Sequence, residues 1–200
     1  MDRSGKFAGD DPFALAREWL AEAQDVELND ANAIALASVD DKGMPNVRIM
    51  LLKEIEDDGF VFYTNFNSKK GAELITSGKA AFVIHWKSLR RQIRVRGLVE
   101  KVDGKEADAY FDSRPPQSRV GAIASRQSQV IADRSVLEGW YEQALKENGE
   151  TPQRPAFWGG FRIQPLEIEF WADGHARLHD RFLWARMAVD QPWIIERLSP

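Results

Sequence analysis

The sequence AIALASVDDKGMPNVRIMLLKEIEDDGFVFYTN, residues 33–65, contains three short apolar runs separated by two turns. The runs span residues 33–39, 47–55 and 60–64. The first turn contains Asp-Asp-Lys-Gly, and the second is Asp57-Asp58-Gly59, whose Asp-Gly pair is typical of a hairpin. Short runs rich in branched and aromatic residues and bounded by turns predict β-strands. The segment therefore predicts a meander of three antiparallel strands.

Further strands and several helices are predicted on either side of this meander. Asp11-Pro12 is typical of a helix start, with an N-cap residue followed by proline in the first turn. Helices are predicted over 12–25, from Ser68 to Gly78, from Asp103 to about residue 111, and from Ser135 to Gly149. Strands are predicted over 80–86, 92–102, 161–171, 177–186 and 193–198. Because strands and helices do not alternate strictly, this order favours an antiparallel barrel with helices over a doubly wound parallel sheet.

Composition limits the classes of protein to which the chain can belong. Its 200 residues favour a single domain, which we expect over residues 11–200 after a flexible tail of residues 1–10. The absence of cysteine excludes disulfides and thiolate metal sites. A net charge of −4 argues against a nucleic-acid binder. No apolar run approaches the roughly 20 residues of a membrane span, and the polar N-terminus does not resemble a signal peptide, so we expect a cytoplasmic protein.

Several common functional signatures do not occur in the sequence. It contains neither GxGxxG nor GxxxxGK[ST], which argues against Rossmann and P-loop sites. It also contains no GxSxG nucleophile elbow. His175 and His179 are four residues apart on a predicted hairpin, where that spacing separates two side chains by roughly 13 Å. We therefore expect no metal site.

Two basic clusters lie within or just after the meander. In Arg48-Ile-Met-Leu-Leu-Lys53, strand alternation places the arginine and the lysine on opposite faces. The second cluster is Tyr63-Thr64 followed by Ser68-Lys69-Lys70, where hydroxyls and lysines surround a predicted helix N-terminus. Such an end can bind an anion. Each cluster taken alone is more typical of an ordinary charged strand end or solvated helix start.

Two further clusters lie in the second half of the chain. Tyr110 and the loop Arg114-Pro-Pro-Gln-Ser118 offer a guanidinium and hydroxyls, a combination that can hold a phosphate, although the loop alone is also compatible with a simple turn. In Arg177-Leu-His179-Asp-Arg181, period-two alternation places the two arginines and the histidine on one face. Three such groups in a row repel one another unless an anion lies over them.

Taken together and in order, these segments resemble the pyridoxine/pyridoxamine 5′-phosphate oxidase family, over residues 11–200. The stretches that carry the resemblance are 48–53, 62–65 with 68–70, 113–115, 157–162 and 177–182. The resemblance implies a mainly β fold, a six-stranded antiparallel split β-barrel with Greek-key order and flanking helices. It also implies a homodimer that binds one FMN in each of two clefts at the subunit interface.

The resemblance further implies an activity and the residues that perform it. The activity is the FMN-dependent oxidation of pyridoxine and pyridoxamine 5′-phosphates by O2, which yields pyridoxal 5′-phosphate and H2O2 in vitamin B6 metabolism. Arg177 and His179 would be catalytic and would contact the substrate, together with Lys53, Tyr110, Arg114 and Ser118. The implied FMN-binding residues are Arg48, Ile49, Met50, Leu51, Leu52, Lys53, Tyr63, Thr64, Lys69, Lys70, Gln92, Gln127, Ser128, Trp171 and Arg181. Position 69 is lysine where the family more often has arginine.

Two alternatives remain open at this stage. A flavin reductase with a nicotinamide donor would not need the full set of substrate-phosphate residues. A non-catalytic carrier of FMN or pyridoxal phosphate would not need Arg177 and His179. A barrel without any ligand leaves unexplained the basic clusters in an acidic protein.

Overall fold

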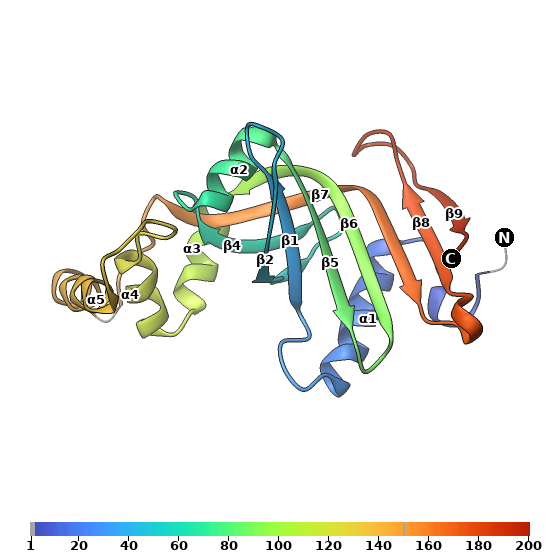
Figure 1. Ribbon diagram of the computed structural model, residues 1–200, viewed down its shortest axis with the longest axis horizontal. Helices are drawn as coiled ribbons and strands as arrows, with labels where there is room; N and C mark the ends of the chain where they lie inside the picture. Colours follow the sequence, from blue (N-terminus) through green and yellow to red (C-terminus); the bar gives the residue numbers. More distant parts are fainter. Residues whose placement is uncertain (1–2, 150) are drawn as a thin grey trace.

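The computed structural model describes residues 3–149 and 151–200 of the chain, which form a single antiparallel sheet with helices around it (Figure 1). The sheet has nine strands in the order β2-β1-β5-β6-β7-β4-β3, and β8 and β9 continue it beyond β7. The strands are β1 (Ala33–Val39), β2 (Pro45–Leu51), β3 (Glu54–Ile55), β4 (Phe60–Asn65), β5 (Lys79–Trp86), β6 (Arg91–Val102), β7 (Trp158–Ala172), β8 (Asp180–Ala185) and β9 (Ile194–Leu198).

The helices lie around the sheet. They are α1 (Pro12–Val26), α2 (Lys69–Ser77), α3 (Gly104–Ser113), α4 (Pro116–Ala124) and α5 (Arg134–Asn148), with the 3-10 turns η1 (Gly5–Phe7) and η2 (His175–Arg177). The last three α-helices connect β6 to β7 and form a lobe at one end of the molecule in Figure 1. In the described part of the chain, no helix combines the length and the apolar character needed to cross a membrane.

The sheet curls into a split barrel because its two edges are consecutive in the chain. β2 lies at one end of the strand order and β3 at the other, yet only Leu52 and Lys53 separate them. The link comprises three Cα–Cα steps from Leu51 to Glu54 and spans at most about 11 Å, so the two edges must lie close together. The backbone N–H of Lys53 already donates to Val61 of β4, 2.8 Å away. The predicted split barrel is confirmed, although with nine strands instead of six.

Aromatic side chains fill the barrel and anchor the helix across it. The inward faces of β4, β5 and β7 bury Phe60, Phe82 and Phe170. Trp19 of α1 is fully buried and packs edge-on against Phe170, with ring centroids 5.1 Å apart. Asp11 caps this helix by accepting a hydrogen bond from the backbone N–H of Phe13, as the sequence predicts. The aromatic core therefore holds α1 against the barrel, on the side away from the helical lobe.

The N-terminal segment differs from the expected tail. In the described residues 3–10, Phe7 is buried against Trp19 and Phe182 of β8, with ring centroids 5.5 and 4.9 Å apart. The indole of Trp19 donates to the carbonyl of Lys6 at 2.8 Å. A single aromatic residue in a polar stretch is a weak sequence signal, which explains the wrong prediction. Met1 and Asp2 lie outside the described residues.

Helix α4 is absent from the prediction because of the pair Pro115-Pro116. The sequence interpretation treats both prolines as a break, but Pro116 occupies the first turn of α4, where a missing N–H costs nothing. Helix α2, in contrast, starts at its predicted cap: the Ser68 hydroxyl accepts from the N–H of Gly71. A side chain at Gly71 would contact the carbonyl oxygen of Phe66 at 2.3 Å, so glycine is required there.

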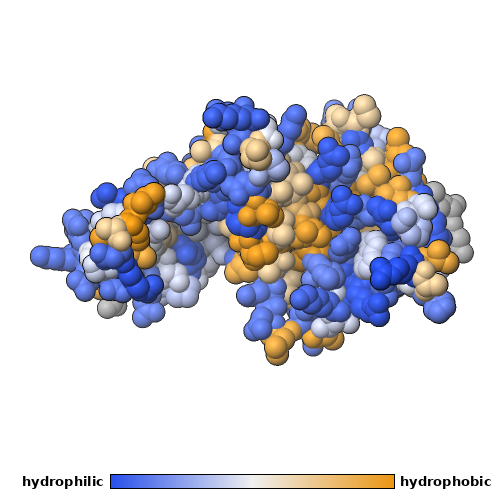
Figure 2. All heavy atoms as spheres, in the orientation of Figure 1, coloured by the Kyte–Doolittle hydropathy of each residue, from blue (hydrophilic) through white to orange (hydrophobic). Residues whose placement is uncertain are grey.

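The outer face of the sheet carries exposed apolar side chains. On the edge strand β2, Val47 and Ile49 are about two-thirds exposed (65% and 66%), and Met44 just before it is equally exposed. Figure 2 shows an apolar area in the middle of this face, where β1 and β2 lie in Figure 1. Further along the sheet, Arg94 of β6 pairs with Glu169 of β7, with 3.0 Å between guanidinium and carboxylate. Arg94 is thus half-exposed and paired with a carboxylate.

Candidate functional site

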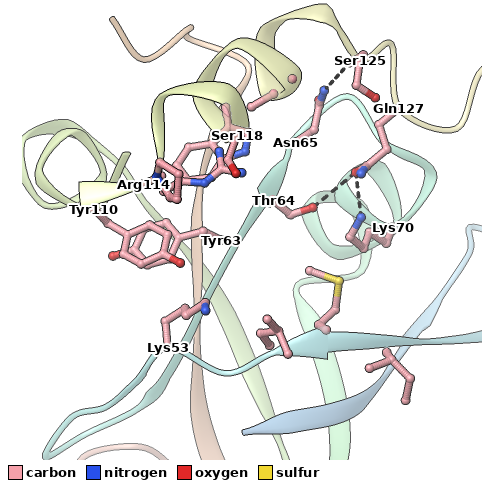
Figure 3. Close-up of a pocket in the computed structure, with 17 residues that line it drawn as sticks. Lys53, Tyr63, Thr64, Asn65, Lys70, Tyr110, Arg114, Ser118, Ser125 and Gln127 are labelled. Atoms are coloured by element: carbon pink, nitrogen blue, oxygen red, sulfur yellow. Dashed lines mark hydrogen bonds between the residues drawn. The ribbon is translucent and has the colours of Figure 1, made fainter. Parts of the chain in front are cut away.

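A cavity of about 670 Å³ lies where the split of the barrel faces the helical lobe (Figure 3). We call it the α4 pocket. Its walls come from β2 and the link after it, from β4, from the start of α2, and from α3 and α4. Its lining residues are Ile49, Met50, Leu51, Lys53, Tyr63, Thr64, Asn65, Lys70, Tyr110, Arg114, Pro115, Ser118, Gly121, Ala122, Ser125, Gln127 and Trp158.

Lys70 is the cation at the α2 side of the pocket. Its ammonium donates to the side-chain oxygen of Gln127 at 2.8 Å, and the hydroxyl of Thr64 lies 3.4 Å from the same oxygen. Only 8% of this lysine is exposed. Burial, followed by the positive charge of Arg48, lowers the pKa of Lys70 to about 8, while Glu73 opposes the shift. A buried lysine held this way favours an anionic ligand, which would stabilise its charged form.

Arg114 is the cation at the opposite side, at the start of α4. Its guanidinium lies over the ring of Trp158, 4.8 Å from the centroid. Its Nη1 is buried and has no hydrogen-bond partner among the described residues. Burial lowers the pKa of this guanidinium. A buried donor without an acceptor is costly, so this atom indicates a place for an anionic oxygen.

Three parallel aromatic rings position the hydroxyl donors of this wall. Tyr63 of β4 stacks on Tyr110 of α3, with centroids 3.9 Å apart, and both are parallel to Trp158. The Tyr63 hydroxyl donates to Glu54 at 3.4 Å. Burial and the nearby carboxylate of Glu54 raise the pKa of Tyr63, which keeps its hydroxyl protonated. Figure 3 shows the two tyrosines between Lys53 and Arg114.

Arg48 points away from the pocket lining in this structure. Its guanidinium donates to the carbonyl of Leu36 at 3.1 Å and to Ser38 at 2.7 Å, and pairs with Glu73 of α2 at 3.2 Å. Burial raises the pKa of Glu73, but hydrogen bonds from Ser38 and Asn46 and the charge of Arg48 outweigh it and lower the pKa. This carboxylate therefore stays ionised and holds Arg48 beside α2.

The predicted site residues fall into three groups. Those in the pocket are Ile49, Met50, Leu51, Lys53, Tyr63, Thr64, Lys70, Tyr110, Arg114, Ser118 and Gln127. Beside it lie Arg48, Lys69 and Ser128. The backbone N–H of Lys69 donates to the Ser128 hydroxyl at 3.2 Å. Leu52, in contrast, is buried in the core. The remaining residues are Gln92, Trp171, Arg177, His179 and Arg181, which line no part of this pocket.

We call these last five residues the β7–β8 cluster. Gln92 of β6 pairs in register with Trp171 of β7, which pairs in turn with Arg181 of β8. The ring of His179 lies 4.7 Å from that of Trp171. β8 and α4 lie at opposite ends of the molecule in Figure 1. One copy of the chain thus carries two separate halves of the predicted site.

The structure corrects the predicted geometry in two places. Residues 177–181 do not share one strand face, because Ala176 and Arg177 adopt left-handed φ values of 54° and 64° in η2 and β8 begins only at Asp180. Similarly, β2 ends at Leu51, so strand alternation does not relate Arg48 to Lys53. In both places the chain leaves the sheet to make a tight connection.

Several lining residues are absent from the sequence interpretation. Trp158 supports Arg114, and Asn65 donates to the carbonyl of Ser125 at 3.3 Å, which ties the loop after α4 to the end of β4. The motif that contains Trp158 supports the resemblance, but nothing in it indicates contact with Arg114. The carboxylates of Glu54, Glu56 and Glu106 also lie close together, next to Arg162, which pairs with the last two.

The fold and the pocket define a class: split β-barrel proteins with a cationic pocket at the split. Two family models match the chain, one described as pyridoxamine 5′-phosphate oxidase over residues 20–146 and one as the pyridoxine 5′-phosphate oxidase C-terminal dimerisation region over residues 158–200. The chain belongs to the pyridoxamine 5′-phosphate oxidase family.

Full-length relatives and a solved structure agree with this assignment. A Cereibacter sphaeroides protein named pyridoxine/pyridoxamine 5′-phosphate oxidase is 64% identical over 200 residues, which is all of both chains. A Ruegeria protein of the same name is 60% identical over 199 residues, covering 100% of this chain and 99% of the relative. The crystal structure of PhzG from Burkholderia lata 383 in complex with tetrahydrophenazine-1-carboxylic acid superimposes with a TM-score of 0.89 at 30% identity, over 96% of this chain and 94% of PhzG.

Proposed function

We propose that this protein is an FMN-dependent oxidase that converts pyridoxine and pyridoxamine 5′-phosphates into pyridoxal 5′-phosphate. With the alcohol, one O2 is consumed and one H2O2 is released. With the amine, one water is also consumed and one ammonia is released. Full-length relatives at 60–64% identity carry this activity in their names. In the structure, the buried Nη1 of Arg114, without a partner among the described residues, is the observation that carries the proposal.

The residues of the α4 pocket fit two phosphorylated ligands. Arg114, with the hydroxyls of Tyr110 and Ser118 and the ammonium of Lys53, would hold the substrate phosphate. Lys70, with Thr64 and Gln127, lies at the other side and would hold the FMN phosphate, with Arg48 held close by. The apolar wall Ile49–Leu51 between these ends would contact the flavin ring.

The pocket residues would hold FMN, and the bound cofactor would supply the redox chemistry that links oxidation of the substrate to reduction of O2. The side chains of the protein would bind the cofactor and the substrate and orient them toward each other. One anion subsite would hold the substrate phosphate, and the other, on the opposite wall of the cavity, would hold the FMN phosphate. The two ligands would thus be kept at a fixed distance from each other, and this proximity would be the main contribution of the protein to the rate. The tyrosine stack lies parallel to Trp158, and the Trp158 ring supports the Arg114 guanidinium. Arg177 and His179 would contact the pyridine ring and complete the site.

A second copy of the chain would bring these last two residues to the pocket. The β7–β8 cluster lies away from the α4 pocket of its own chain, and it falls within residues 158–200, the match to the family's dimerisation region, except for Gln92. The exposed apolar face of β2 adjoins the pocket through Ile49, which belongs to both. Pairing through this face would bury it and place the partner's cluster over the split.

An anaerobic experiment tests the proposed activity. The protein is loaded with FMN, pyridoxine 5′-phosphate is added, and the visible absorbance of the oxidised flavin is followed. Bleaching, with recovery on admission of air, supports the oxidase. Persistent absorbance with FMN still bound contradicts it, and bleaching by reduced nicotinamide instead would identify a flavin reductase. If neither donor bleaches the flavin, the chain is a carrier.

The affinity for FMN is expected to fall as the pH rises above about 8. Burial lowers the pKa of Lys70 to about 8 in the free protein, and a bound phosphate dianion favours the charged lysine. Above this pH, binding must therefore take up a proton, and Kd rises by up to about tenfold per pH unit. Fluorescence titration between pH 7 and 9.5 measures this dependence.

Riboflavin and a charge-free variant are the matched controls. Riboflavin has the same ring but no phosphate, so its Kd should change little over this range. In Lys70→Gln the slope for FMN should disappear. A slope that is equal for FMN and riboflavin would contradict the assignment of Lys70 to the phosphate.

A further inference from the structure

The carboxylate of Asp173 lies between a guanidinium and an imidazole at the end of β7. One oxygen is 2.6 Å from Nη2 of Arg90, in the turn between β5 and β6, and the other is 3.3 Å from Nδ1 of His179. The backbone N–H of Asp173 also donates to the carbonyl of Arg90 at 3.0 Å. Asp173 is thus attached at two points to a neighbouring turn, and its free oxygen faces the histidine.

The imidazole of His179 is held on two further sides. The backbone N–H of Gly174 donates to Nδ1 at 3.2 Å, and the ring lies against Trp171 with centroids 4.7 Å apart. A side chain at position 174 would meet the carbonyl oxygen of Leu178 at 1.9 Å, so only glycine permits this close turn. All polar contacts that the structure gives this ring involve Nδ1, which leaves Nε2 as the nitrogen available to a ligand.

The two partners of Nδ1 suit different protonation states. A neutral ring with a bare Nδ1 accepts from Gly174, and a ring protonated at Nδ1 donates to the carboxylate of Asp173. The ring therefore has a partner in the same place in either state, and Nε2 keeps its direction. Arg90 pairs with one oxygen of the Asp173 carboxylate, which leaves the other oxygen to accept a hydrogen bond from His179.

We infer that Asp173, anchored by Arg90, is a positioning residue that fixes the orientation of His179 for the reaction. The inference rests on the proposed function, in which His179 contacts the substrate ring. It assigns to Asp173 and Arg90 a role in orientation rather than direct contact with the substrate. A positioning role of this kind acts on turnover more than on substrate binding.

The test uses the FMN-loaded protein and the nearly isosteric variant Asp173→Asn. We expect kcat to fall by about tenfold, as for the loss of one hydrogen bond to a charged group, while KM changes by less than about twofold. Arg90→Gln keeps the carboxylate but removes its anchor, and should lower kcat in the same direction. The control is Glu22→Gln, which removes the 2.8 Å ion pair to the neighbouring Arg91 without contact to His179, and should match wild type.

A second measurement does not depend on activity. The ¹⁵N resonances of the His179 ring should shift in Asp173→Asn, whereas those of His85 and His175 and the flavin content should not. Unchanged kcat in both Asp173→Asn and Arg90→Gln, or unchanged His179 resonances, would overturn the inference. If wild type itself oxidises neither B6 phosphate, the proposed function fails instead, and the resonance shift alone then decides whether Asp173 holds the ring.

Discussion

Replacing Arg114 by methionine is expected to raise KM for pyridoxine 5′-phosphate by about 100-fold, because removal of one partner of a buried charge pair costs about 2–5 kcal/mol. Methionine retains contact with Trp158 but offers no donor. The guanidinium that it replaces is buried, and its Nη1 has no partner among the described residues. Steady-state kinetics measure the change. Bound FMN should be retained, since Arg114 lies on the wall opposite Lys70.

Two further variants delimit the role of Arg114. Arg114→Lys keeps the charge but loses the two-pronged geometry, so its KM should lie between those of wild type and Arg114→Met. Arg134→Met removes an exposed arginine of α5 that pairs with Glu138, and should leave KM unchanged. An unchanged KM in Arg114→Met would remove this residue from the substrate-phosphate site.

Mixing two inactive variants is expected to restore activity if each site combines residues from two chains. Arg114→Met disables the α4 pocket, and Arg177→Asn disables the β7–β8 cluster. Asparagine is chosen because it tolerates the left-handed backbone of Arg177, whose φ is 64°. At a substrate concentration near the wild-type KM, far below that of Arg114→Met, each variant alone should lose most of its activity. After random exchange of subunits, half of the dimers are mixed and each has one intact site, so about a quarter of the wild-type activity returns.

The control pairs two variants from the same half of the site. Mixing Arg114→Met with Lys53→Met should restore nothing, because both residues line the α4 pocket and every mixed dimer keeps two damaged sites. The assay is the oxidation rate of pyridoxine 5′-phosphate after co-expression of the two variants, without selection of the mixed dimers. Equal activity in the mixed and unmixed preparations would contradict a shared site and place all the residues in one chain.

Sequence patterns predict the regular elements of this fold well, because local signals dominate there. The apolar run 33–39 matches β1 residue for residue, and the cap at Ser68 starts α2 where expected. The errors occur where tertiary contacts override the local pattern. Ala176 and Arg177 adopt left-handed backbone without glycine or asparagine to indicate it, and Phe7 leaves a polar segment to pack against Phe182.

The site is predictable in part. The resemblance names Tyr110, Arg114 and Ser118, and the structure brings them together in one cavity. It does not indicate which residues lie beneath them. Trp158 supports Arg114 from a strand more than 40 positions away, and Asp173 reaches His179 only because η2 folds back. Such contacts depend on the three-dimensional path of the chain, which residue types and spacing alone do not specify.

The two-residue link between β2 and β3 makes the pocket part of the closure of the barrel. A ligand that contacts both Lys53 on the link and Lys70 on α2 would connect these two parts of the chain and so help to keep the barrel closed. Since any ligand that binds only the folded state adds to its stability, the loaded protein should resist opening at this link. Cofactor supply would then govern how long the protein survives, as well as how fast it works.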